Sequence, residues 1–185
     1  TIEFIFYTEV PKDKKITYAS FVADYRPLKQ EKWRLRLVVG GNKLDYEYDS
    51  GSPAADLVET KLLLNSTISD AKYGAKYASM DLKDMFLHTL MKDPEYMKVP
   101  IKYFPPDICK RYDLHNKVHN GYVYIRINKG MYGLKQAAIL ANKKVSGLLE
   151  QAGYEQILGS HGMWRHKSRK ILFTLCVDDF GIKYV

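Results

Sequence analysis

Alternating and continuous runs of apolar residues predict strands at several places along the chain. From Trp33 to Val39 basic and apolar side chains alternate ahead of Gly40-Gly41, as they do in a half-buried strand with one cationic face. Arg34 and Arg36 should therefore point to the same side. Further strands are expected over residues 2–7, 16–22, 75–82, 96–99, 122–128, 171–177 and 180–185.

Helices are indicated by a 3.6-residue period and by end signals. Gly153 closes a segment whose apolar residues recur at helical spacing, at positions 137, 141, 145, 148 and 152. Ser52-Pro53 is typical of an N-cap and a first helical turn, and the acids Asp56 and Glu59 follow it, so a helix should run to about Ser69. A short helix is expected over 84–90 and an irregular excursion over 105–120.

Two of the predicted strands lead into acidic residues. The run 171–177 reaches Asp178-Asp179 and the next run returns from it, which predicts a hairpin with two acids at its tip. Adjacent carboxylates repel each other, and a bound cation would remove the repulsion. Taken alone, the pair is more simply interpreted as an ordinary polar turn. Asp81 changes this because it also ends an apolar strand, and neighbouring strands would bring three carboxylates together as a site for Mg²⁺ and two-metal phosphoryl transfer.

A turn bracketed by two glycines, Gly130 to Gly133, opens the long helix. The simplest interpretation is a helix entry followed by a solvated Lys135. The functional interpretation is that Lys135, Gln136 and open backbone lie near a helix N-terminus, where phosphate or a nucleotide is favoured.

Composition ranks these interpretations without deciding between them. The 185 residues are 46% hydrophobic, enough to bury the core of one compact unit or of two small subdomains. Lys and Arg number 29 against 21 Asp and Glu, a net charge of +8 that favours anionic partners such as nucleic acid. Cys109 and Cys176 lack a metal-ligand spacing, and His161 and His166 lack a third ligand for zinc. No apolar run approaches about 18 residues, so a soluble, intracellular protein without a membrane partner is expected.

Taken in order, these segments resemble the reverse transcriptases of copia-type (LTR) retrotransposons. That family has an Ala-Arg-Leu-Val strand, a Ser-Pro helix start, a Leu-Asp-Val-Lys-Asn-Ala-Phe-Leu-His segment, Tyr-Met, Leu-Tyr-Gly-Leu-Lys-Gln-Ala and Tyr-Val-Asp-Asp. The matching segments here are Leu35 to Val38, Ser52-Pro53, Met80 to His88, Tyr96-Met97, Met131 to Ala137 and Cys176 to Asp179. The likeness covers about residues 33 to 185. Departures are Met80 before the first acid, Ala138-Ile139 in place of Pro-Arg, and Cys176 in place of Tyr.

The resemblance implies an RNA-directed DNA polymerase that adds deoxynucleotides to a primer 3′-hydroxyl by two-metal phosphoryl transfer. It implies catalytic and metal-binding roles for Asp81, Asp178 and Asp179. The backbone carbonyl of Leu82 is a further expected metal ligand. The implied cofactor is a pair of Mg²⁺ ions, with Mn²⁺ as an alternative.

The resemblance also implies a set of nucleotide-binding residues, to which Leu82 belongs. Arg34 and Arg36 match the basic positions of a strand whose cations neutralise the triphosphate. Phe86 matches the aromatic residue that rejects a ribose 2′-hydroxyl, and a core phenylalanine is the alternative interpretation. Gln136 matches a glutamine beside the nucleotide and the template.

The implied fold is α+β: a right-hand polymerase palm whose antiparallel sheet is backed by helices near 137–152 and 83–90, with fingers and without a thumb. We expect fingers over 1–74 and palm over 75–185, with a fingers excursion at about 100–130 and an end just after the Asp-Asp hairpin. The first residue is not Met and the last lies in an apolar run, so we expect a piece of a longer polyprotein.

The expected partners are an RNA or DNA template with its primer, deoxynucleoside triphosphates, and the thumb and RNase H parts of the polyprotein. The expected location is a cytoplasmic virus-like particle or the nucleus. Two other classes of function remain open at this point. One is a catalytically decayed element remnant that only binds nucleic acid, and the other is a structural or partner-binding domain in which Asp178-Asp179 is a turn.

Overall fold

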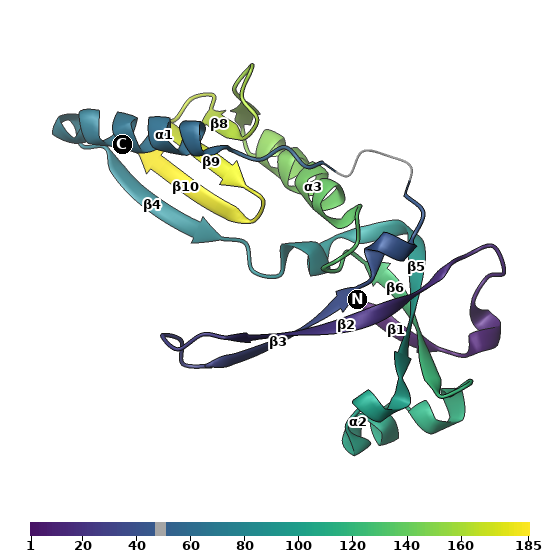
Figure 1. The fold of residues 1–185 in the computed structure, drawn as a ribbon. Coiled ribbons are helices and arrows are strands. Elements are labelled where there is room, and N and C mark those ends of the chain that lie inside the picture. Colours follow the sequence, from purple (N-terminus) through teal and green to yellow (C-terminus); the bar gives the residue numbers. More distant parts are fainter. Residues whose placement is uncertain (47–50) are drawn as a thin grey trace. The chain divides into compact units, whose positions relative to one another are not determined.

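The computed structural model describes residues 1–46 and 51–185, and these form a mixed α+β structure, as expected. The chain makes two compact units (Figure 1). One unit comprises Thr1–Asp49 and Phe86–Ala137, and the other comprises Ser50–Met85 and Ala138–Val185. Each unit is built on one five-stranded sheet. The assignment of fingers and palm to parts of the chain stays a prediction.

The first unit has the strand order β1-β6-β5-β2-β3. Only β2 and β5 pair in parallel, and the other neighbours are antiparallel. The core of the sheet consists of aliphatic side chains such as Met97, Val123 and Ile127, which are essentially inaccessible to solvent. The strands are β1 (Ile2–Ile5), β2 (Ile16–Tyr25), β3 (Trp33–Val39), β5 (Leu90–Pro100) and β6 (Tyr122–Lys129).

Strand β5 is longer than the predicted strand over 96–99 because it continues through a bulge. Leu90 pairs with Lys129 and Glu95 pairs with Ile127, so several residues of β5 lie opposite one residue of β6. Pro94 lies in this stretch and has no N–H to donate, which is why the sequence pattern of a strand stops there. A bulge accommodates the extra residues and changes the direction of the side chains that follow.

The excursion over 105–120, predicted to be irregular, contains two short helical segments. These are α2 (Pro106–Arg111), which begins with a proline in its first turn, and a 3₁₀ turn at Leu114–Lys117. Cys109 and Leu114 are buried there against Val123 of β6. Further 3₁₀ turns lie at Tyr7–Glu9, Gly41–Lys43 and Ile101–Tyr103.

The second unit has an entirely antiparallel sheet with the order β4-β10-β9-β8-β7. One face packs on the long helix, where Val145 and Leu149 contact the core of Trp164, Phe173 and Phe180. The β7–β8 hairpin was not predicted, because strands of three and four residues are too short to establish an alternation. The elements are β4 (Lys76–Asp81), α3 (Ala137–Gln151), β7 (Tyr154–Gln156), β8 (Met163–His166), β9 (Ile171–Cys176) and β10 (Asp179–Tyr184).

Helix α1 (Leu57–Ser69) belongs to this second unit, and its predicted start was wrong. Its N-cap is Asp56, which forms a capping box with Glu59, and Ser52-Pro53 precedes the helix. The reason is that the N–H of Ala55 donates to the carbonyl oxygen of Leu175 in β9, at 2.8 Å, which keeps this segment extended. The predicted end at Ser69 is confirmed.

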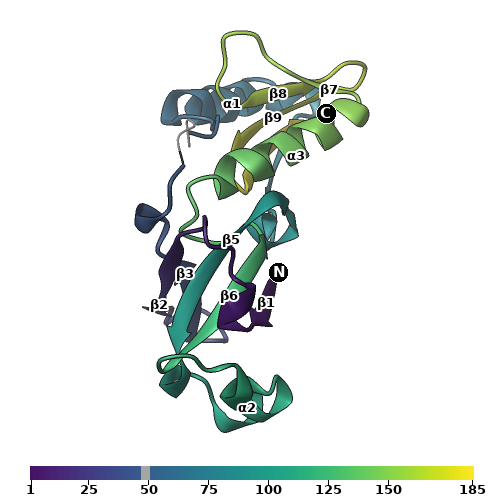
Figure 2. The same cartoon turned by 90° about the vertical axis from the view of Figure 1, so that its right-hand side faces the viewer.

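Helices α1 and α3 lie on opposite faces of this sheet (Figure 2). Phe180 and Ile182 of β10 point toward α3, so Lys183 points to the other face. Its amine donates to Ser66 and pairs with Asp70 at the end of α1.

The expected second backing helix over 83–90 is instead a single 3₁₀ turn at Met85–His88. The residue before it, Asp84, has a φ of +55°, which an α-helix cannot contain. Within the part of the chain that is described, none of the helices has the length and apolar character needed to span a bilayer.

Candidate active site

Strand pairing brings two of the three predicted acids side by side. In β10, Asp179 lies directly opposite Asp81 of β4 and, on its other side, opposite Cys176 of β9. Residues directly opposite each other in antiparallel strands present their side chains on the same face. Asp81, Asp179 and Cys176 therefore form an exposed row across three strands, on the face opposite to the one that packs on α3. The expectation that the two acid-bearing strands are neighbours is confirmed.

The third acid lies in the tight turn between β9 and β10. Val177 and Asp178 connect the two strands, and Val177 has a φ of +60°, a conformation that is strained for a β-branched residue by about 1–3 kcal/mol. The backbone oxygen of Asp178 accepts a hydrogen bond from the N–H of Leu82, at 2.8 Å. This bond ties the turn to the end of β4, so the paired strands hold the strained residue in place.

Among the described residues, the three acids have no counter-charge. Within residues 1–46 and 51–185, no ion pair or side-chain hydrogen bond neutralises Asp81, Asp178 or Asp179. The same residues contain no ready-made cluster of three or more metal-ligating side chains. Mg²⁺ needs only one or two carboxylates, because water and substrate phosphates complete its shell. Two unpartnered carboxylates on neighbouring strands fit that requirement, and their role as ligands, with the Leu82 carbonyl, stays a prediction.

Predicted nucleotide-binding residues meet in the first unit. The guanidinium of Arg36 lies over the ring of Tyr132, 5.8 Å from its centroid. Tyr132 in turn meets Phe86 edge to face, with centroids 5.3 Å apart. Tyr132 therefore links Arg36 of β3 to the half-buried Phe86 in the 3₁₀ turn at Met85–His88. The sequence motifs indicated all three residues but not their mutual contact.

The glycines around the turn that carries Tyr132 allow it to approach β3 closely. The N–H of Val39 donates to the carbonyl oxygen of Tyr132, at 2.8 Å. A Cβ on Gly133 would lie 2.0 Å from the oxygen of Val39, and a Cβ on Gly41 would lie 2.0 Å from the oxygen of Gly133. Gly133 also has a φ of +96°. Only glycine satisfies the geometry on either side of this contact.

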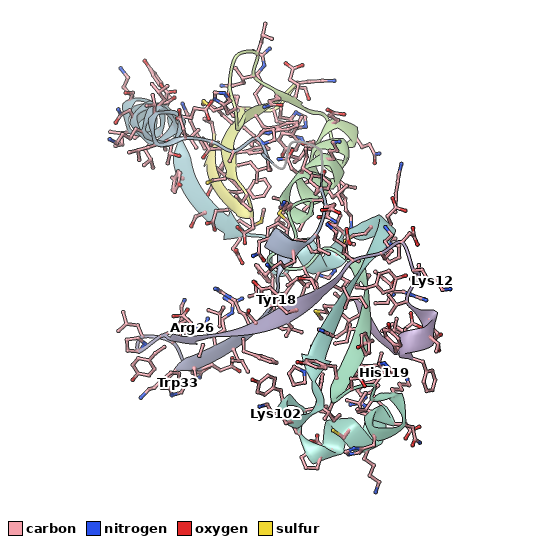
Figure 3. All side chains as sticks on the ribbon, turned by 45° about the vertical axis from the view of Figure 1, so that its right-hand side comes forward. Lys12, Tyr18, Arg26, Trp33, Lys102 and His119 are labelled. Carbon is pink, nitrogen blue, oxygen red and sulfur yellow. The ribbon has the colours of Figure 1, made fainter. Side chains whose placement is uncertain are left out.

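The two arginines of β3 share one face of a protruding ribbon. Arg34 is opposite Asp24 and Arg36 is opposite Val22, so the predicted common direction is confirmed. The face expected to be buried is exposed instead, with Trp33 70% and Leu35 67% accessible. Figure 3 shows Arg26 and Trp33 near the tip of this ribbon. The reason is that residues 19–25 of β2 pair with β3, whereas only residues 16–18 pair with β5, so the ribbon extends beyond the sheet.

Gln136 is buried and is bonded to a residue that sequence reasoning missed. Its side-chain nitrogen Nε2 donates to Oε1 of Glu95, at 2.9 Å, and Gln136 is only 8% exposed. Burial raises the pKa of the Glu95 carboxyl, while the bond from Gln136 and the charge of Lys14 act in the opposite direction. The only sequence signal was an acid directly after Pro94, just before the predicted strand over 96–99.

The predicted site residues therefore form two sets, one in each unit. Asp81, Leu82, Asp178 and Asp179 belong to the second unit. Arg34, Arg36, Phe86 and Gln136 belong to the first.

Comparison with known proteins agrees with the motifs. The family model of reverse transcriptase (RNA-dependent DNA polymerase) matches residues 5–184. The chain is 30% identical over 102 residues to the putative transposon Ty5-1 protein of Saccharomyces cerevisiae; this match covers 54% of the chain and 29% of that protein. The chain thus spans less than a third of that relative, and no solved structure matches it. Since the family match covers nearly its whole length, the chain belongs to the reverse transcriptase family.

Proposed function

We propose that this chain is the RNA-directed DNA polymerase core of a copia-type retrotransposon polyprotein. The observation that carries the proposal is the direct pairing of Asp81 with Asp179, beside the strained turn of Asp178, at an end of the sheet where no cation neutralises them among the described residues. Such a concentration of unpaired charge is unfavourable without a ligand. In a member of the reverse transcriptase family, it supports a metal-dependent nucleotidyl transfer site.

In this proposal the fingers come from residues 1–74 with an excursion at about 100–130, and the rest of 75–185 belongs to the palm. Asp81, Asp178 and Asp179 would hold the metal, with the Leu82 carbonyl as a further ligand. Two bound Mg²⁺ ions would supply activation of the primer hydroxyl and stabilisation of the leaving pyrophosphate. The bond from Leu82 to Asp178 keeps the turn in one position against the end of β4.

The first unit would hold the nucleotide. Arg34 and Arg36 share one face of the ribbon and have no carboxylate partner among the described residues, so both cations are available to phosphate. Phe86 stands against Tyr132, an arrangement suited to exclude a 2′-hydroxyl by contact. Gln136 would contact the nucleotide and the template. The net charge of +8 suits a template with its primer as a partner.

Other features of the proposal follow from the parent protein. The thumb and RNase H parts of the polyprotein would be its partners in the same chain. Its location would be a cytoplasmic virus-like particle or the nucleus.

Primer extension tests the proposal. The full-length parent protein would be assayed on an RNA template with Mg²⁺ and deoxynucleotides, next to its Asp178→Asn variant and to Asp13→Asn as a matched control. Asp13 is an exposed acid of the first unit, far along the sequence from the paired acids. We expect Asp178→Asn to abolish synthesis and Asp13→Asn to leave it unchanged. A folded wild type that binds the template without synthesis would instead favour the decayed, binding-only remnant.

A further inference from the structure

The hydrogen bond between Glu95 and Gln136 joins two segments that are 41 residues apart. Glu95 lies where β5 leaves its bulge, and Gln136 lies between the glycine turn and α3. Both belong to the first unit. Bulges are frequent beside functional sites because they redirect a side chain. The bulge here directs a carboxylate to the one buried amide among the predicted nucleotide residues.

We propose that Glu95 is a positioning residue that holds the Gln136 carboxamide in one orientation at the nucleotide site. This inference rests on the proposed function, which gives Gln136 its contact with the nucleotide. It adds a residue from outside the sequence motifs to the machinery of that site.

The chemistry of the pair determines the orientation. A glutamine side chain ends in an oxygen that accepts and an NH₂ group that donates, and the two ends are nearly equal in shape. An ionised carboxylate can only accept, so Glu95 selects the orientation in which the NH₂ group faces β5. One N–H and the carbonyl oxygen of Gln136 are then left for a ligand. A neutral partner at position 95 could also donate, and both orientations would be satisfied.

Other contacts fix the backbone at Gln136, so Glu95 acts only on the orientation of the side chain. The turn before it is fixed by the bond from Val39 to Tyr132 and by the close approach of Gly133 to Gly41. What the fold leaves undetermined is the rotation of the amide at the end of the side chain. Glu95 is the residue that determines it.

The charge of Glu95 depends on its surroundings. Burial raises the pKa of the carboxyl, the bond from Gln136 and the charge of Lys14 lower it, and Asp93 and Asp45 raise it. Lys14 precedes β2, Asp45 follows β3, and Asp93 lies on β5 itself. As the pH falls through the raised pKa, Glu95 gains a proton and its selection of one amide orientation is lost. Nucleotide affinity should then fall on the acid side.

Single-nucleotide incorporation by the full-length protein tests the inference. We expect Glu95→Ala to raise the KM for the deoxynucleotide about tenfold, with kcat changed by less than about twofold. The matched control is Asp107→Asn, an exposed acid of the same unit that does not act on the charge of Glu95, and it should leave KM unchanged. In a Gln136→Ala background Glu95→Ala should have almost no further effect, because the residue it positions is gone. Independent, multiplying effects of the two substitutions would overturn the proposal.

Two further measurements keep the test decisive if Glu95→Ala does not fold. The near-isosteric Glu95→Gln should remove the acid-side rise of KM that is expected for the wild type. In this chain, the NMR signals of the Gln136 side-chain amide should shift as Glu95 titrates and should stay constant in Glu95→Gln. An amide that does not respond to pH contradicts the inference even without an activity assay. Synthesis that depends on Asp178 but not on Glu95 would leave the proposed function standing and reject this inference alone.

Discussion

The two units position their candidate site residues by different means. In the second unit, Asp81 and Asp179 are neighbours because of the register of a regular antiparallel sheet. In the first unit, Arg36, Phe86 and Gln136 depend on contacts between separate segments, made through Tyr132 and Glu95. Register is enforced by every backbone bond of the strands, whereas a side-chain contact depends on a few atoms. The contacts that position site residues in the first unit should therefore be more sensitive to single substitutions than the strand register of the second.

The largest effect is expected at the contact between the glycine turn and β3. Gly133→Ala would place a Cβ within 2.0 Å of a backbone oxygen at a φ of +96°, so the turn must move or the unit must unfold. We expect a loss of more than about 3 kcal/mol in the free energy of unfolding. Gly74→Ala is the matched control in the second unit, because its φ of +90° is similar and no atom lies within 4 Å of the added Cβ.

The control should lose only about 1–2 kcal/mol, the cost of the left-handed backbone alone. Denaturant unfolding of both variants measures the difference. Equal losses would mean that the close approach of the turn to β3 contributes nothing, and that the contacts of the first unit are not the more sensitive ones.

Features that local sequence patterns determine were predicted, and features that depend on contacts between distant segments were missed. The pairing of the two acid-bearing strands was inferred because each was an apolar run ending in Asp, and local periodicity located β3, β9 and α3. The start of α1 was missed because it depends on the bond from Ala55 to Leu175. The exposed face of the ribbon was missed because alternation defines two faces without stating which one is covered. Glu95 was missed because its partner lies 41 residues away.

A second comparison lies in two carboxylates, the buried Glu59 of the second unit and the half-buried Glu95 of the first, that respond oppositely to acid. Burial acts to raise the pKa of Glu59, but hydrogen bonds from Ser160 and from the backbone of His161, Asp56 and Gly162 outweigh it and leave the pKa below 4.5. The pKa of Glu95 lies above 4.5. Stability contributed by Glu59 is present above pH 4.5 and is lost as the pH falls through its lowered pKa. Between 4.5 and the raised pKa of Glu95, the folded first unit binds more protons than the unfolded one, so its stability rises as the pH falls.

Amide hydrogen exchange measured against pH can follow both units in one sample. Protection in β9 should weaken on acidification below pH 4.5, while protection in β6 should first increase. Glu59→Gln should remove the acid-induced loss of protection in β9. It should also lower the free energy of unfolding of the second unit by about 1–3 kcal/mol, because the charge-assisted bonds from Ser160 at 2.6 Å and from the N–H of His161 at 2.8 Å are lost. Parallel trends in the two units would contradict the assignment of opposite shifts.

The smallest effect is expected on the exposed face of the ribbon. Leu35 is 67% accessible, so Leu35→Thr should change the free energy of unfolding by less than about 0.5 kcal/mol. Thr is β-branched, a shape that suits a strand, so β3 should keep its pairing with β2 and the direction of Arg36. Leu175→Thr is the matched substitution at a site 1% accessible in the second unit, and it should cost at least about 2 kcal/mol because it buries a hydroxyl and leaves a cavity. The denaturant midpoints of the two variants measure these two losses of stability. A large loss at Leu35 would mean that this face is covered in the folded protein, and the sensitivity of the first unit would then extend from its turn to its ribbon.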